Sequence, residues 1–181
     1  MSVNSEAGLV LIETSVRCRP SHEGEAMSRL RSARQSRMQY VWPLRAEART
    51  VGHARSIIRE ELSGLDLHDD VVDDAVLMVS ELVTNAFMYG EGPYELLLHV
   101  DAKEVMCVVV DAGPPLPAPS PPDPVAEHGR GLRIVARLSD GFYGCHPQRY
   151  LTHPDLVGKA TWFALPRRGR PGNVVPIRAG T

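Results

Sequence analysis

The strongest structural signal in the chain lies between Asp69 and Gly90, where the sequence is DDVVDDAVLMVSELVTNAFMYG. Its apolar side chains recur at helical spacing, which predicts a long amphipathic helix with one face against a core. The residues of that face are Val72, Ala75, Val76, Val79, Val83 and Ala86. Asp69 or Asp70 can cap the start of the helix, and Gly90 can end it.

The segments around this helix predict an α+β fold. Further helices are expected at residues 46–62, ended by Ser63-Gly64, and at 132–138, after His128-Gly129-Arg130-Gly131. Strands are expected at residues 40–42, stopped by Pro43, at 94–100 and 105–110 as a hairpin, and at 160–165. This order favours a two-layer α/β sandwich, with the helices on one face of the sheet, over a doubly wound fold.

Length and composition fit one domain with tails. The 181 residues are 43% hydrophobic and 23% charged, which suffices for one core. We expect a flexible tail at residues 1–39, a domain at 40–166 and a second tail at 167–181. Seven of the 15 prolines fall in residues 114–124, which predicts a stiff, extended loop that is a lid or a linker; its place between two of the candidate binding segments favours a lid.

Charge and hydropathy exclude several classes of function. Lys+Arg 20 against Asp+Glu 22 give a net charge of -2, so nucleic acid is not expected as a direct partner. Apolar runs are far shorter than the ~18 residues of a membrane span and too short for a signal peptide, so we expect a cytoplasmic protein without membrane contact. Cys18, Cys107 and Cys145 lie far apart, which argues against a disulfide framework and a zinc site. Cys107 is predicted to be a core residue.

Three places in the sequence are suited to chemistry, and each also has an ordinary structural explanation. Glu81 and Asn85, one helical turn apart, present a carboxylate and a carboxamide, or simply a solvated face. Asp111, two residues before Gly113, is a ligand acceptor or a turn residue. Residues 129–131 stand at the start of a predicted helix, where they form a phosphate-binding site or only a flexible turn. The chain has neither a Walker-type nor a Rossmann glycine motif.

Together and in order, four motifs resemble the nucleotide-binding boxes of the GHKL ATPases, which have the Bergerat fold. They are Glu81-Leu82-Val83-Thr84-Asn85-Ala86, Asp111-x-Gly113, Gly129-Arg130-Gly131-Leu132 and Gly158-Lys159-Ala160-Thr161. Within that superfamily the chain is most similar to the small bacterial anti-sigma regulatory factors, the serine-protein kinase branch. Over residues 40–166 the resemblance implies a mixed, mostly antiparallel sheet.

The resemblance also implies a site for ATP and Mg²⁺. Asn85 would hold the metal, Glu81 would act as general base or orient the attacking hydroxyl, and Asp111 would accept a hydrogen bond from the adenine amino group. The other implied nucleotide contacts are Thr84, Gly113, Gly129, Arg130, Gly131, Leu132 and Thr161. Two positions depart from the family pattern: Tyr89 stands where histidine is common, and Pro115 replaces the second glycine after Asp111.

By this resemblance the protein phosphorylates serine or threonine on an anti-sigma factor antagonist and sequesters a sigma factor, and a homodimer is left open. Two alternatives remain. One is a module that binds ATP as a structural ligand, or no nucleotide, and sequesters a protein without catalysis, which Pro115 favours. The other is a plain α+β interaction domain in which the face of Glu81 and Asn85 is solvated surface.

Overall fold

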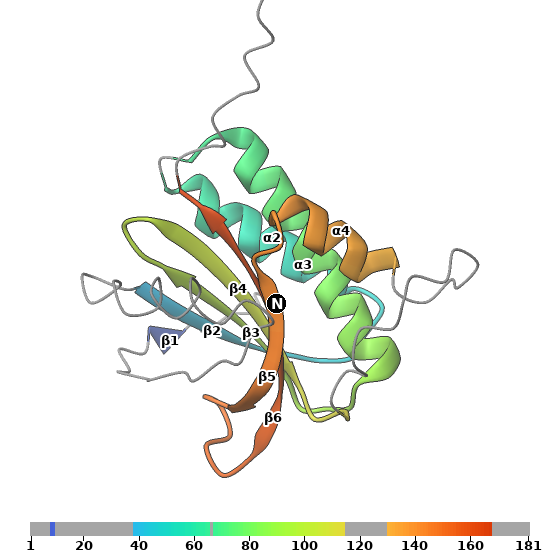
Figure 1. Ribbon diagram of the computed structural model, residues 1–181. Helices are drawn as coiled ribbons and strands as arrows, with labels where there is room; N and C mark the ends of the chain where they lie inside the picture. Colours follow the sequence, from blue (N-terminus) through green and yellow to red (C-terminus); the bar gives the residue numbers. More distant parts are fainter. Residues whose placement is uncertain (1–7, 10–37, 66, 115–129, 168–181) are drawn as a thin grey trace, which may run out of the picture.

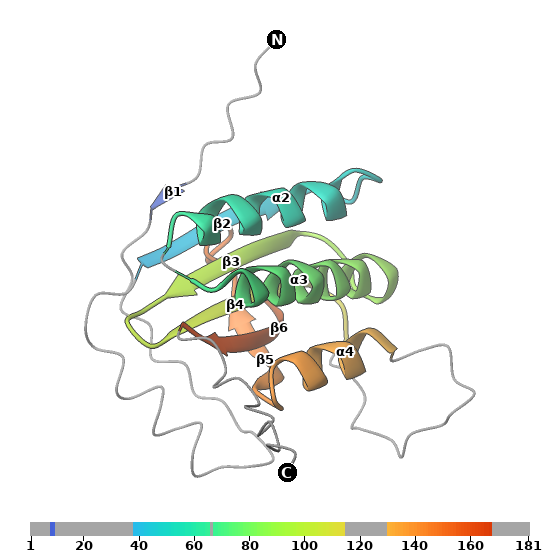
Figure 2. The same ribbon diagram turned by 90° about the horizontal axis from the view of Figure 1, so that it is seen from above.

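The computed structural model describes residues 8–9, 38–65, 67–114 and 130–167, and these residues form two layers. Three helices among them lie together on one face of a six-stranded sheet (Figures 1 and 2). The helices are α2 (Thr50–Ser63), α3 (Asp69–Tyr89) and α4 (Arg130–Leu138). The strands are β1 (Gly8–Leu9), β2 (Met38–Leu44), β3 (Tyr94–Val100), β4 (Glu104–Asp111), β5 (Tyr143–Arg149) and β6 (Val157–Pro166). The predicted α+β sandwich with helices on one face is confirmed.

The strands follow the order β1-β2-β3-β4-β6-β5 across the sheet, so β6, the last of the described strands, lies between β4 and β5. The β3–β4 hairpin turns at Asp101, whose Oδ1 accepts hydrogen bonds from the backbone N–H groups of Lys103 and Glu104 at 2.7 and 2.9 Å. Every pairing in the described chain is antiparallel, so the parallel part of the predicted mixed sheet is not found among these strands.

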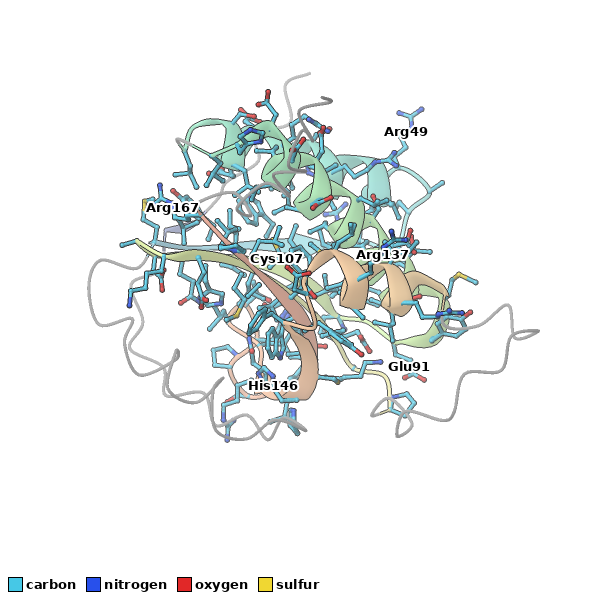
Figure 3. The ribbon with its side chains drawn as sticks, turned by 45° about the horizontal axis from the view of Figure 1, so that its top comes forward. Arg49, Glu91, Cys107, Arg137, His146 and Arg167 are labelled. Carbon is cyan, nitrogen blue, oxygen red and sulfur yellow. The ribbon has the colours of Figure 1, made fainter. Side chains whose placement is uncertain are left out.

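The main core fills the space between the helices and the sheet. Alternate residues of β4 point to opposite faces, and Val105, Cys107 and Val109 face the helices. From α3 the core receives Val72, Ala75, Val76, Val79, Val83 and Ala86, as predicted. Cys107 lies between the two layers (Figure 3), and burial raises the pKa of its thiol. Its predicted core position is therefore confirmed.

A smaller cluster covers the other face of the sheet. Val108 and Val110 of β4 pack there with Tyr150, which is 1% exposed. The segment that carries Tyr150 is tied to β3 by the carboxylate of Glu95, which accepts hydrogen bonds from the backbone N–H groups of Leu151 and Thr152 at 2.9 and 3.1 Å. The backbone at the end of β4 is therefore packed from both sides.

Two predicted boundaries at the start of the domain are wrong. Pro43 does not stop β2, which continues to Leu44; β1 pairs only with Tyr40 and Val41, so Pro43 lies beyond it, where a missing N–H breaks no described ladder. The helix predicted from residue 46 begins at Thr50, because the preceding residues form a turn in which the Thr50 hydroxyl donates to the Arg45 carbonyl at 2.5 Å.

Two further predictions need correction. His68, rather than Asp69 or Asp70, stands at the N-cap of α3, and both aspartates lie in the first turn, where the helix dipole favours negative charge. Strand β5 was not predicted at all. Its sequence, YGCHPQR, contains a glycine and a proline, and every second residue is exposed because it forms one edge of the described sheet.

Parts of three predictions lie outside the described residues. They are the tails at residues 1–7, 10–37 and 168–181, most of the proline-rich loop at 115–124, and Gly129. Within the predicted N-terminal tail, residues 8–9 pair with β2 as β1. No helix in the part of the chain that the structure describes is long and apolar enough to cross a membrane.

Candidate functional site

The glycine at the start of α4 lies against the polar face of α3. A Cβ atom built on Gly131 would lie 2.5 Å from Oε2 of Glu81 and 3.4 Å from Nδ2 of Asn85. Glu81, Thr84 and Asn85 are partly exposed, whereas Leu82 and Val83 between them are buried. The first of the three predicted chemical places, Glu81 and Asn85, therefore meets the third, the start of α4, on one side of α3. The first N–H groups of a helix have no partner within the helix and can donate to a ligand.

The remaining residues predicted around the phosphates have different positions. Arg130 is the first residue of α4, and Gly129 lies outside the described residues. Leu132 is partly buried and packs against the main core, so its side chain anchors α4 to the core. Of this motif, the contact with Glu81 and Asn85 is made by Gly131.

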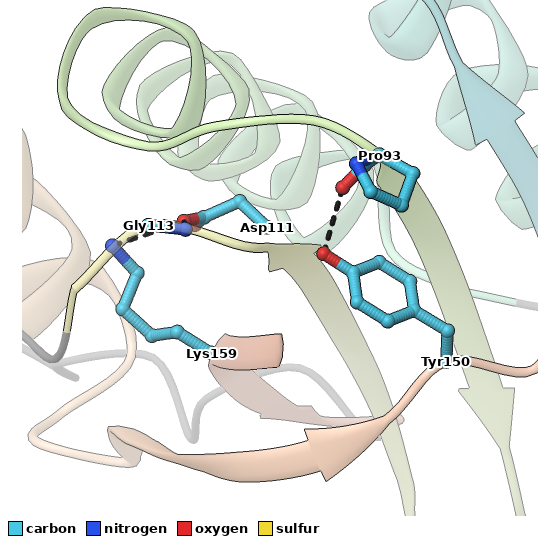
Figure 4. A network of polar contacts seen from close by, with 5 residues as sticks. All are labelled: Pro93, Asp111, Gly113, Tyr150 and Lys159. Carbon is cyan, nitrogen blue, oxygen red and sulfur yellow. Dashed lines mark hydrogen bonds and ion pairs between the residues drawn. The ribbon is translucent and has the colours of Figure 1, made fainter. Parts of the chain in front are cut away.

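A second polar group lies at the end of β4. Asp111 is 1% exposed, and its Oδ1 accepts a hydrogen bond from the Gly113 N–H at 2.8 Å. The Lys159 Nζ lies 3.2 Å from the same oxygen (Figure 4), and Lys159 is directly opposite Asp111 in the β4–β6 register. Both of these contacts are made by Oδ1, and none of the described residues donates to Oδ2.

The C-terminal end of α3 touches this group. A Cβ atom on Gly90 would collide with Asp111 Oδ1, and one on Gly113 would lie 2.5 Å from the Gly90 Cα. The Ala112 N–H donates to the Glu91 carbonyl at 2.7 Å, which joins the two segments. Glycine is required at both positions because a side chain would displace the Asp111 carboxylate or the backbone that holds it.

One helix therefore connects the two groups. Asn85 and Gly90 are five residues apart, which corresponds to about 7.5 Å of helical rise. The Glu81–Asn85–Gly131 group lies on a side of α3, and the Asp111–Gly113 group contacts the C-terminal end of the same helix. Thr161 is buried on β6 and, two residues from Lys159, faces the same side of the sheet; it pairs with Val109. The predicted adenine contacts are thus neighbours on β4 and β6.

At the end of β4, burial and the neighbouring donors shift the pKa of Asp111 in opposite directions. Burial raises the pKa of the Asp111 carboxyl, while the Gly113 N–H and the Lys159 ammonium both lower it. The net shift is upward, since burial is the largest cause. A charged carboxylate at this place therefore depends on its two hydrogen-bonding partners.

Two residues at the site were missed by sequence analysis. Lys159 was quoted within a motif but given no role, although strand alternation places it on the same face as Thr161. Tyr150 carried no signal. Its O–H donates to the Pro93 carbonyl at 2.7 Å (Figure 4), and burial together with the charges of Asp111 and Glu95 raises its pKa to about 12.

The residues could hold the implied ligands. Asn85 and Glu81 offer oxygen atoms, the ligand type that Mg²⁺ prefers, and Mg²⁺ usually takes few ligands from protein. Both groups include a glycine at which a Cβ atom would collide with a polar side chain, so the backbone approaches these polar atoms closely. The chemistry of these donors therefore fits a magnesium-bound purine nucleotide.

Comparison with known proteins identifies a family. The family described as histidine kinase-like ATPase domain matches residues 44–148, more than half of the chain. This span includes Glu81, Asn85, Asp111 and Gly131, and it ends before β6, which carries Lys159 and Thr161. No curated protein matches the chain.

Proposed function

The chain belongs to the histidine kinase-like ATPase domain family, and on that premise we propose that it is an ATP-binding regulator of the anti-sigma type. It acts as a serine/threonine protein kinase on an anti-sigma factor antagonist, and it sequesters a sigma factor. The proposal extends the family assignment to a substrate and to partners, which are carried over from the resemblance of the four motifs.

The observation that supports it is the contact of two polar groups with α3. Asp111 and Gly113 lie at the C-terminal end of the helix, and Gly131 lies against Glu81 and Asn85, one to two turns earlier. A nucleotide needs two separate polar groups of this kind. Its base requires directional hydrogen bonds, whereas its phosphates require charge neutralisation and N–H donors.

The residues have distinct roles in this mechanism. Asn85 would hold Mg²⁺ through its carboxamide oxygen; the metal, when bound, supplies neutralisation of phosphate charge. Glu81 would accept the proton of the attacking serine or threonine hydroxyl, or orient that hydroxyl by a hydrogen bond. The N–H groups of the first turn of α4 would donate to the phosphates, which the close approach of Gly131 allows. Asp111 would bind the adenine amino group.

Two measurements on the full chain test the proposal. Isothermal titration with ATP and Mg²⁺ should show binding, and ADP should form faster when an anti-sigma factor antagonist from the same genome is added. Glu81→Gln should keep ATP binding and lose transfer by roughly a hundredfold or more, the usual contribution of a general base. Glu60→Gln, an exposed carboxylate on α2, is the matched control and should change neither.

The outcomes separate the alternatives. ATP binding without transfer in the unaltered chain would identify a non-catalytic sequestering module. No nucleotide binding at all would leave a plain interaction domain.

A further inference from the structure

A buried ion pair lies at the place where the proposed function requires the adenine ring to bind. The side chains of Lys159 and Asp111 are 8% and 2% exposed, and Nζ and Oδ1 are 3.2 Å apart. The surface pair of Arg59 and Asp73 is very different, with side chains 54% and 66% exposed. Lys159 therefore does not extend its ammonium into solvent, as a lysine at the end of a strand ordinarily does.

Such a pair contributes little to folding. The desolvation of two charges offsets most of their attraction, and apolar residues of similar size are often as stabilising. The rest of the helix-facing side of β4 and β6 is largely apolar, with Val105, Cys107, Val109 and Phe163. An ion pair at the one end that meets the candidate site therefore points to a role in ligand binding.

The pair controls which hydrogen bonds Asp111 can make. A charged carboxylate only accepts, whereas a protonated carboxyl also has an O–H donor. Burial favours the protonated form and the Lys159 ammonium favours the charged form. Oδ1 is engaged by Lys159 and Gly113, and Oδ2 accepts from none of the described residues.

We propose that Lys159 determines base specificity: it occupies Oδ1 and keeps Asp111 charged, so that Oδ2 accepts from an amino purine and rejects an oxo purine. An oxo purine places its carbonyl oxygen, an acceptor, against Oδ2, which is also an acceptor. Neither of these two oxygens then has a hydrogen bond, and a site built to bind a donor strongly rejects such a base. The inference rests on the proposed function, because it requires a nucleotide at this site.

The backbone holds the lysine in place. Gly158 lies so close to its neighbours that a Cβ atom there would be 2.7 Å from the Asp111 carbonyl oxygen and 2.8 Å from the Tyr150 hydroxyl. The register then sets Lys159 opposite Asp111. The ammonium is thus positioned by the sheet before any ligand arrives.

The test compares ATP with ITP, in which a 6-carbonyl replaces the amino group and N1 carries a proton, by titration of the full chain with Mg²⁺ present. The unaltered chain should prefer ATP by roughly ten- to a hundredfold, the range for a hydrogen bond to a charged group. Lys159→Met should reduce that ratio about tenfold or more. Lys159→Gln, which keeps a donor for Oδ1 without the charge, should also reduce it and serves if the Met variant does not fold. Lys159→Arg keeps the charge and should keep the preference.

Each other result would overturn the inference. ATP binding with an unchanged ATP-to-ITP ratio in both neutral variants would make the pair merely structural. Tighter binding of both nucleotides by Lys159→Met would show that the lysine obstructs the base. If the unaltered chain binds neither nucleotide, the proposed function fails and this inference fails with it.

Discussion

At the Asp111 end of the site the polar groups are held by buried neighbours, whereas at the Glu81 end they stand partly exposed on the surfaces of two helices. Asp111 is enclosed by Lys159, Gly113 and Gly90, all within van der Waals or hydrogen-bonding distance. Glu81 and Asn85 have flexible side chains that face a glycine. The difference predicts that a change in the first group disturbs buried neighbours, while the second group can change without loss of the fold.

The largest effect is expected from Asp111→Asn, which leaves the buried Lys159 ammonium without its carboxylate. Breaking a buried ion pair in this way should lower the free energy of unfolding by about 3–5 kcal/mol, measured by urea denaturation. It should also weaken ATP binding. The double variant Asp111→Asn/Lys159→Met has no buried charge and should regain most of the lost stability. An equally low stability in the double variant would count against the ion pair as the cause.

Glycine-to-valine changes compare the two ends directly. Gly113→Val places a side chain against backbone atoms of Gly90 and should cost about 1–3 kcal/mol of stability, as overpacking does. Gly131→Val meets Oε2 of Glu81, the end of a flexible side chain that can move away. It should therefore leave the melting temperature nearly unchanged and weaken ATP more than adenosine. Equal destabilisation by both variants would remove the distinction between the ends.

Asn85→Ala tests the exposed end by itself. The side chain is outside the apolar core and alanine favours helix, so the free energy of unfolding should stay within about 0.5 kcal/mol. Binding of ATP with Mg²⁺ should be lost, while binding of adenosine should persist. Titrations with both ligands, with and without Mg²⁺, check this. Unchanged affinity for Mg²⁺-ATP would show that Asn85 is not the metal ligand.

The smallest effect is expected from Tyr150→Phe, which removes the hydrogen bond to the Pro93 carbonyl behind Asp111. The cost should be about 1 kcal/mol, measured by urea denaturation at neutral pH. Because folding raises the tyrosine pKa from its usual value near 10 to about 12, this stabilisation is complete below pH 10 and is lost as the pH rises through 12. The stability difference between the two proteins should shrink over that window. A constant difference would mean that Tyr150 acts only by packing.

Sequence analysis predicted the elements with regular patterns. The apolar stripe of α3 and the two β-rich runs that form the β3–β4 hairpin are local properties; both elements were predicted, and the core residues of α3 with them. The order of the four motifs along the chain led to the family that the comparison then gave. Local periodicity suffices for these because a long amphipathic helix and a buried hairpin have few alternatives.

What sequence analysis missed depends on contacts between distant residues. Nothing near Lys159 in the sequence marks it as the partner of Asp111, because the pair exists only through the β4–β6 register. Tyr150 meets Pro93 across 57 positions in the chain. Strand β5 alternates between exposed and partly buried residues that are mostly polar, so its hydrogen bonds to β6 rather than its side chains make it a strand.

The position of β6 between β4 and β5 also sets the order in which the protein can be assembled during synthesis. In the described sheet β5 pairs with β6 alone, so it leaves the ribosome before its neighbour exists. Asp111 likewise waits for Lys159, which is made 48 residues later. A nascent chain that ends before residue 157 has α3 and the β3–β4 hairpin, but its Asp111 carboxylate lacks the lysine. Nucleotide binding of the proposed kind therefore becomes available only after β6 has been synthesised and inserted between β4 and β5.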